Sequence, residues 1–84
     1  MNTTIAIDPG MSKCGLILAD VKDKKVFKAE VIHSNCLMTY VKEIYQKDNR
    51  LQCIIGDGTG SKKYIERLRT LIPNLIVAQE RNST

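Results

Sequence analysis

The chain has 84 residues, a hydrophobic fraction of 43%, and 13 basic against 9 acidic side chains, giving a net charge of +4. This length leaves room for a single domain, expected over residues 1–84, and the hydrophobic fraction excludes a disordered chain. No apolar run approaches the roughly 20 residues of a membrane helix, so we expect a cytoplasmic protein without a membrane partner. The positive charge permits a polyanionic partner such as nucleic acid.

The first half of the chain predicts three strands. Residues 3–8 form a β-branched run that ends on Asp8 and is followed by Pro9-Gly10, a turn signal. Residues 13–20 and 25–32 are two further strand patterns, and the short polar connection between them predicts an antiparallel meander. In the third strand, Phe27, Ala29 and Val31 share one face and Lys28 and Glu30 the other, the alternation typical of a strand that is wet on one side.

The second half alternates between helix and strand. Helical spacing predicts a helix from Cys36 to about Asp48, with Ser34 or Asn35 as its N-cap. Residues 52–56 form a short apolar run, and a second helix begins at Ser61 and ends before Pro73. Residues 75–78 are continuously apolar, as in a strand covered on both faces. The predicted fold is therefore α/β, with three antiparallel strands followed by helix-linked parallel strands in the order βββαβαβ.

Three cysteines, Cys14, Cys36 and Cys53, lie far apart without C-x-x-C spacing or a histidine partner. This pattern does not suit a zinc site, and we interpret all three as reduced core residues.

Three carboxylates follow apolar runs that would carry them to the carboxyl edge of the sheet: Asp8, Asp57 and Glu80. If their strands are neighbours, these side chains converge, and converging carboxylates need a cation such as Mg²⁺ or Mn²⁺. Such a site could hydrolyse phosphodiester bonds with metal-activated water. We therefore take the three as candidate catalytic and metal-binding residues. The simpler alternatives are turn initiation for Asp8 and Asp57, and a surface ion pair of Glu80 with Arg81.

The second predicted helix carries basic residues on its polar side, among them Lys62 and Lys63. A solvated helix face is the default interpretation, and contact with nucleic-acid phosphates is the alternative.

Two segments resemble a known family. IAIDPGMSKCGLILAD, residues 5–20, resembles the first hairpin of the Holliday-junction resolvase superfamily, in which Asp-x-Gly-x-x-x-x-Gly opens a ribonuclease-H-like fold. QERNST, residues 79–84, resembles the Asp-Glu-Arg-x-x-Thr motif of its YqgF-like branch, with Gln79 in place of the usual Asp; RuvC-like nucleases belong to the same superfamily.

The resemblance implies a metal-dependent endonuclease acting on branched DNA or on structured RNA, as in ribosomal RNA processing. It implies that Asp8 and Glu80 are metal ligands, that Ser12 and Lys13 lie beside the substrate phosphates, and that Arg81 and Thr84 shape the same rim. Family members continue into a helix with a further catalytic carboxylate, which this chain lacks. A truncated chain, or a short homologue that completes its site as a homodimer, would account for that difference.

Two other functions remain open. The related actin-like and sugar-kinase fold also opens with Asp-x-Gly in a hairpin, and the loop Gly56-Asp57-Gly58-Thr59-Gly60 could bind nucleotide phosphate, as in ATP, through its backbone amides. A non-catalytic module that binds nucleic acid or protein through its basic helix is the third hypothesis.

Overall fold

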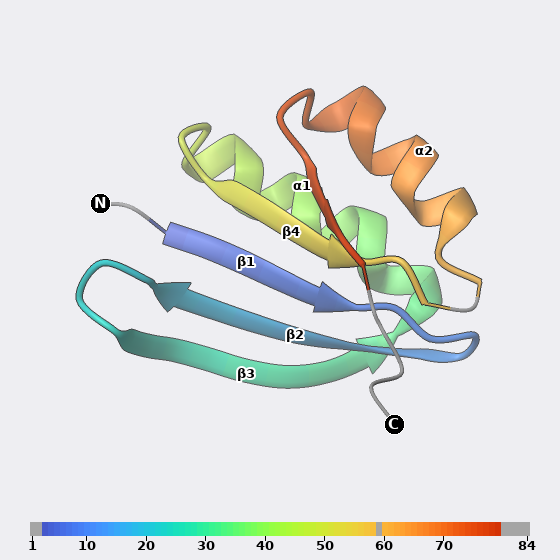
Figure 1. Cartoon of the computed structure of the whole chain (residues 1–84), viewed down its shortest axis with the longest axis horizontal. Helices are drawn as coiled ribbons and strands as arrows, with labels where there is room; N and C mark the ends of the chain where they lie inside the picture. Colours follow the sequence, from blue (N-terminus) through green and yellow to red (C-terminus); the bar gives the residue numbers. More distant parts are fainter. Residues whose placement is uncertain (1–2, 59, 80–84) are drawn as a thin grey trace.

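A computed structural model describes residues 3–58 and 60–79 of the chain. The described residues form five strands and two α-helices, and a short 3₁₀ helix precedes the first α-helix. Figure 1 shows how these elements are arranged. In chain order they are β1 (Thr3–Asp8), β2 (Lys13–Asp20), β3 (Lys25–His33), η1 (Ser34–Cys36), α1 (Leu37–Lys47), β4 (Gln52–Gly56), α2 (Lys62–Leu71) and β5 (Ile76–Ala78). The predicted order βββαβαβ is therefore present.

The five strands form one mixed sheet in the order β3-β2-β1-β4-β5, so β1 lies at its centre. β1, β2 and β3 pair antiparallel, which confirms the predicted meander. β4 pairs parallel with β1, and β5 pairs parallel with β4. Both parallel pairs are reached through a helix, as parallel neighbours require. The carboxyl ends of β1, β4 and β5 consequently meet at one edge of the sheet.

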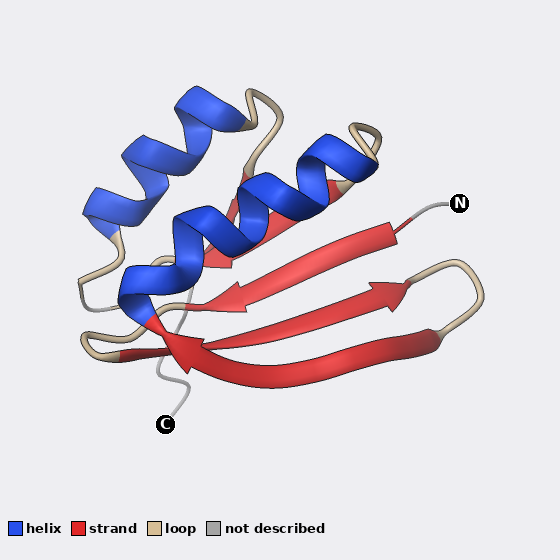
Figure 2. Cartoon of the chain, turned by 180° about the vertical axis from the view of Figure 1, so that it is seen from behind, coloured by secondary structure: helices blue, strands red, loops and turns tan. Residues whose placement is uncertain are grey.

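Both helices cover the same face of the sheet, as the rear view in Figure 2 shows. The core lies between this face and the helices, and its apolar residues alternate along the strands while recurring at helical spacing in α1 and α2. Its fully buried members are Ile5, Leu37, Ile55, Leu68, Ile72, Val41, Cys14 and Cys53. Because no helix covers the other face in the described part of the chain, we call that face the open face.

The apolar side of β3 faces away from the core. The alternation in its sequence suggests the opposite, with the apolar side buried and the polar side exposed to water. Val31 pairs with Gly15 and Ala29 pairs with Ile17, on the open face. Phe27 is 50% exposed and Val31 67% exposed. The register decides this orientation, because β2 must direct Cys14, Leu16 and Leu18 toward the helices. The polar side of β3 is thereby directed toward α1.

Several local predictions differ from the structure. Neither Ser34 nor Asn35 caps α1: both belong to η1, and Cys36 occupies the N-cap position. Ser61 is the N-cap of α2, but its side chain makes no capping hydrogen bond. Cys36 is exposed rather than a core residue, whereas Cys14 and Cys53 are buried as expected. The last strand is shorter than predicted and is covered on one face only.

Candidate functional site

Asp8 ends the central strand and is exposed at the carboxyl edge of the sheet. It pairs with Gly15 of β2, and continuing the β1–β4 register beyond Ile7 and Ile55 brings it beside Gly56. A Cβ placed on Gly15 would lie 3.7 Å from the Asp8 Cβ, so the missing side chain leaves room next to the carboxylate. The Asp8 carboxylate therefore has small neighbours on both adjacent strands.

The loop from Pro9 to Ser12 is held in place by a buried serine. The Ser34 Oγ donates a hydrogen bond to the Gly10 carbonyl over 2.8 Å, and the Ser34 N–H donates to the Ser12 carbonyl over 2.9 Å. Ser34 is only 5% exposed and also lies 3.4 Å from the Cys14 Sγ. These contacts fix the loop against the start of η1. The sequence offered no signal for this role beyond the position of a serine after a strand.

Gly10 is required by this loop geometry. A Cβ at Gly10 would clash with the backbone carbonyl oxygen of Lys13, an atom that can move only if the hairpin itself shifts. The loop backbone therefore approaches itself more closely than any other residue type allows.

The second loop at this edge connects β4 to α2. The Asp57 N–H donates to the Ala78 carbonyl over 2.9 Å, and the Ser61 N–H donates to the Gly58 carbonyl over 3.1 Å. Gly60 has a φ of +79°, which lies in the left-handed region that favours glycine. A Cβ at Gly60 would lie 3.8 Å from the Met11 Cγ. The two loops therefore lie close together, although 49 positions separate Met11 from Gly60 and β2, β3, α1 and β4 lie between them in the sequence.

This close approach places the β1–β2 loop next to the N-terminus of α2. In the described part of the chain, α2 is the only helix whose N-terminus lies next to both loops. The first N–H groups of a helix have no partner within the helix and carry a partial positive charge. Here they follow a glycine-containing loop, an arrangement typical of anion-binding sites in α/β proteins. The edge therefore combines two exposed carboxylates, Asp8 and Asp57, with backbone donors.

The other predicted site residues divide into two groups. Ser12 and Lys13 are exposed in the β1–β2 hairpin beside Asp8, and Lys62 and Lys63 are exposed in the first turn of α2. The Lys63 Nζ lies 5.1 Å from the centre of the Tyr64 ring. Glu80, Arg81 and Thr84 lie outside the described residues.

The three-carboxylate metal cluster is not found where the structure can test it. Across residues 3–58 and 60–79, no three His, Cys, Asp or Glu side chains are grouped so as to hold a metal ion. Asp8 and Asp57 do follow neighbouring parallel strands, as predicted. The predicted third ligand, Glu80, belongs to the segment that is not described.

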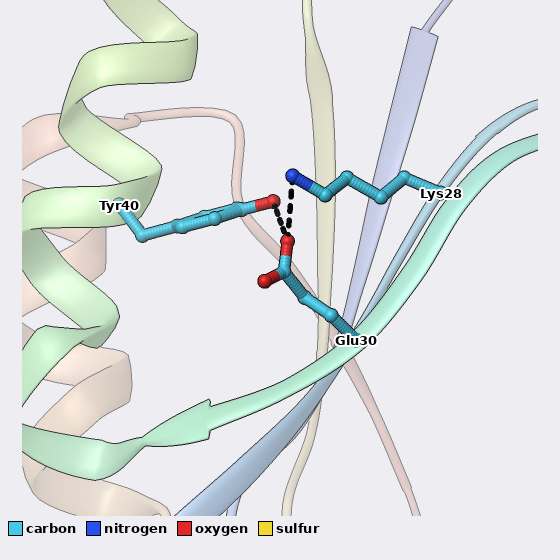
Figure 3. Close-up of polar contacts among 3 residues, drawn as sticks. All are labelled: Lys28, Glu30 and Tyr40. Carbon is cyan, nitrogen blue, oxygen red and sulfur yellow. Dashed lines mark hydrogen bonds and ion pairs between the residues drawn. The ribbon is translucent and has the colours of Figure 1, made fainter.

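A separate polar cluster joins β3 to α1, as Figure 3 shows. The Tyr40 hydroxyl donates to the Glu30 Oε2 over 2.7 Å, and the Lys28 Nζ lies 2.9 Å from the same oxygen. These hydrogen bonds, first from Tyr40 and then from Lys28, lower the pKa of Glu30. Burial, and then the bond to Glu30, raises the pKa of Tyr40. The cluster links two elements and lies on the helix-covered side of β3.

None of the helices described is long and apolar enough to cross a membrane. A cytoplasmic location stays a prediction of the sequence.

Comparison with known protein families and with curated proteins finds no match. Comparison with solved structures finds several. A Bacteroides thetaiotaomicron protein of unknown function, described as having an actin-like ATPase fold, matches 92% of this chain with a TM-score of 0.68 and 7% identity. A Ppx/GppA phosphatase from Aquifex aeolicus matches 94% with a TM-score of 0.52 and 12% identity. An exopolyphosphatase from Cytophaga hutchinsonii matches 93% with a TM-score of 0.55 and 12% identity.

The chain spans about a third of the length of these proteins, 32%, 36% and 34% respectively. At such low identity the matches establish the fold alone: an α/β arrangement shared with part of the actin-like ATPase fold.

These neighbours correct the nuclease interpretation. They are an actin-like ATPase-fold protein and two phosphatases, not Holliday-junction resolvases, so the family assignment, the endonuclease activity and the nucleic-acid partner are wrong. The ribonuclease-H-like designation of the fold is not confirmed. The error has a physical cause: Asp-x-Gly in the first hairpin suits either fold, because both place a carboxylate at a strand tip followed by a tight turn.

Proposed function

We propose that this chain provides a phosphate-binding site of the actin-like ATPase type, for a nucleotide such as ATP or for polyphosphate. The observation that carries the proposal is the close approach of the β1–β2 loop to the β4–α2 loop, where the Met11 side chain lies next to Gly60. Support comes from the structural neighbours, which are described as an ATPase-fold protein and as phosphatases of the Ppx/GppA and exopolyphosphatase types.

Backbone donors and three side chains would bind the phosphate. The exposed Ser12 and Lys13 lie in the hairpin next to Asp8, and Lys62 begins α2. A lysine supplies a point charge to phosphate, while loop and helix N–H groups supply directional hydrogen bonds. The Ser34 contacts hold the hairpin in position before the ligand arrives, which reduces the entropy lost on binding.

Asp8 is the proposed contact for a divalent cation that accompanies the phosphate. Mg²⁺ retains several waters and is commonly bound by one or two carboxylates together with substrate phosphates, so a three-carboxylate cluster is not needed. Asp57, beyond the neighbouring strand, is a second proposed contact. Mn²⁺ has the same preference for oxygen ligands. The cation would offset the repulsion between Asp8 and the phosphate oxygens.

Titration calorimetry of ATP and of tripolyphosphate, each with and without Mg²⁺, tests the proposal. Lys13→Ala should weaken binding of both ligands about tenfold, because a charge-assisted hydrogen bond is lost. Asp8→Asn should weaken binding only when Mg²⁺ is present, since without the metal the carboxylate repels the phosphate. Equal affinity of wild type and Asp8→Asn for Mg²⁺-ATP would contradict the metal contact.

Lys22→Ala is the matched control. Lys22 is exposed in the β2–β3 turn, at the opposite end of β2 from Lys13. It should leave both affinities unchanged. If Lys22→Ala and Lys13→Ala weaken binding equally, the ligands respond to the net charge of the chain and the proposed site is wrong.

We also propose that residues 1–84 form one domain. All five described strands belong to one sheet with one core. Unfolding by urea, monitored by circular dichroism, should therefore show a single transition. Two separated transitions would contradict this.

A further inference from the structure

The excess positive charge of the chain is confined to its two α-helices. α1 and α2 carry six of the 13 basic side chains and two of the 9 acidic ones, so the rest of the sequence carries seven of each. Counting Asp48, the C-cap of α1, with the helices still leaves them three more basic than acidic groups. All eight charged side chains of the helices are exposed. The helical layer is therefore a cationic surface on an otherwise balanced chain.

A groove between the two helices brings cations from both together. α1 and α2 lie side by side over the sheet in Figures 1 and 2. The groove holds about 360 Å³, and each helix contributes three lining residues: Met38, Thr39 and Lys42 from α1, and Arg67, Thr70 and Leu71 from α2. Neither acidic residue of the helices, Glu43 or Glu66, lines it. No described carboxylate lies within ion-pair distance of Lys42 or Arg67. The groove thus has a cation without an ion-pair partner on each side.

We infer that this interhelical groove is a docking site for an acidic segment of a partner protein, in which one apolar side chain is flanked by Asp or Glu. Met38 and Leu71 are half-buried and give the groove an apolar surface. Methionine is an adaptable contact for apolar groups. Lys42 and Arg67 would bind carboxylates on the two sides of the anchor, and the arginine can do so through two parallel hydrogen bonds.

Other occupants match fewer of these features. An inorganic polyanion would use the two cations and leave the apolar surface in water. A bilayer surface is too broad to enter a groove between helices whose axes lie about 8 to 10 Å apart. A two-fold dimer through the same surface would oppose two cationic layers, and like charges facing each other repel. No two acidic residues are adjacent in the 84-residue sequence, so the matching segment comes from another polypeptide.

Fluorescence anisotropy tests the inference with a fluorescein-labelled peptide of eight residues, in which a central Leu is flanked by Glu and Asp, at 150 mM salt. Wild type should bind the peptide saturably. Lys42→Gln/Arg67→Gln should bind it at least tenfold more weakly, because the charge-assisted contacts are lost. A peptide with Ser in place of the Leu should bind wild type about tenfold more weakly, because the apolar anchor is missing.

Lys47→Gln/Arg69→Gln is the matched control. It removes the same charge from the same two helices, at exposed positions that do not line the groove. Charges that do not contact the peptide contribute little at 150 mM salt, where the Debye length is about 8 Å, so this variant should bind as wild type does. Lys13→Ala should also bind the peptide as wild type does. The peptide and tripolyphosphate experiments can therefore fail independently of each other.

Four outcomes would overturn the inference. They are the absence of saturable binding to wild type, equal weakening by the two double variants, equal affinity for the Leu and Ser peptides, and a wild-type dimer in analytical ultracentrifugation that Lys42→Gln/Arg67→Gln abolishes. Glutamine is a good helix former, so both double variants should fold, which circular dichroism checks. Lys42→Gln alone gives the same comparison if the double variant unfolds.

Discussion

At the scale of single residues, the tightest constraint falls on Gly10. Because a Cβ there would clash with the Lys13 carbonyl, Gly10→Ala should lower the free energy of unfolding by about 1 to 3 kcal/mol. Gly15→Ala is the matched control: its Cβ would make an ordinary contact 3.7 Å from the Asp8 Cβ, so its cost should be under about 1 kcal/mol. Urea unfolding of the two variants measures both values. Equal losses of unfolding free energy in the two variants would contradict the predicted clash, because they would show that the hairpin backbone shifts to accommodate a side chain at Gly10.

The contact between Tyr40 and Glu30 predicts a pH dependence. Since the hydrogen bonds lower the pKa of Glu30, their contribution is fully present above the pKa of the unfolded carboxyl, near 4.5, and is lost as pH falls through the folded value. Tyr40→Phe removes the first of these bonds. The difference in unfolding free energy between wild type and Tyr40→Phe should therefore be larger at pH 6 than at pH 3. A difference that does not change with pH would contradict this account.

Residue roles were only partly predictable from the sequence. Asp8 could be placed at a strand tip because an apolar run and Pro9-Gly10 bracket it. Ser34 could not be connected to Gly10, because that hydrogen bond joins residues 24 positions apart and depends on the β2–β3 register. The orientation of Phe27 depends on the same register, and alternation alone does not say which side faces the core.

At the scale of elements, the strand and helix ranges were predictable to within one or two residues, because turns and changes of period mark their ends. The number of covered faces was not: the continuous apolar run at residues 75–78 predicts burial on both sides, whereas Ile76 and Ala78 of β5 are exposed. The helix-facing sides of β2 and β4 are, by contrast, fully buried at Cys14 and Cys53.

The burial of these two strand faces predicts which thiols react. Burial raises the pKa of Cys53 to about 12, so its thiolate is scarce at neutral pH, and Cys14 is inaccessible. Cys36 is exposed. Ellman's reagent should therefore titrate one thiol in the folded protein and all three in guanidinium, and Cys36→Ser should remove the fast reaction. Rapid modification of a second thiol in the folded chain would show that β2 or β4 opens readily.

At the scale of the whole molecule, the order of elements was predictable while the protein class was not. A βββαβαβ chain with Asp-x-Gly in its first hairpin suits both a nuclease and an actin-like ATPase fold. The motif near the end of the chain, at Gln79 and beyond, favoured the nuclease, but short motifs match by chance. Only the three-dimensional comparison distinguished the two, because it uses the geometry of nearly the whole chain, 92% in the first match.

The central claim is that phosphate binds where the first hairpin meets the entrance of α2. The most direct test is a ¹H–¹⁵N NMR titration of the labelled chain with tripolyphosphate and Mg²⁺. We predict saturable shifts of the backbone amides of residues 10–13 and 60–63 together, with one dissociation constant. Shifts confined to lysine-rich surfaces elsewhere, such as the β2–β3 turn, or separate dissociation constants for the two loops, would contradict the account.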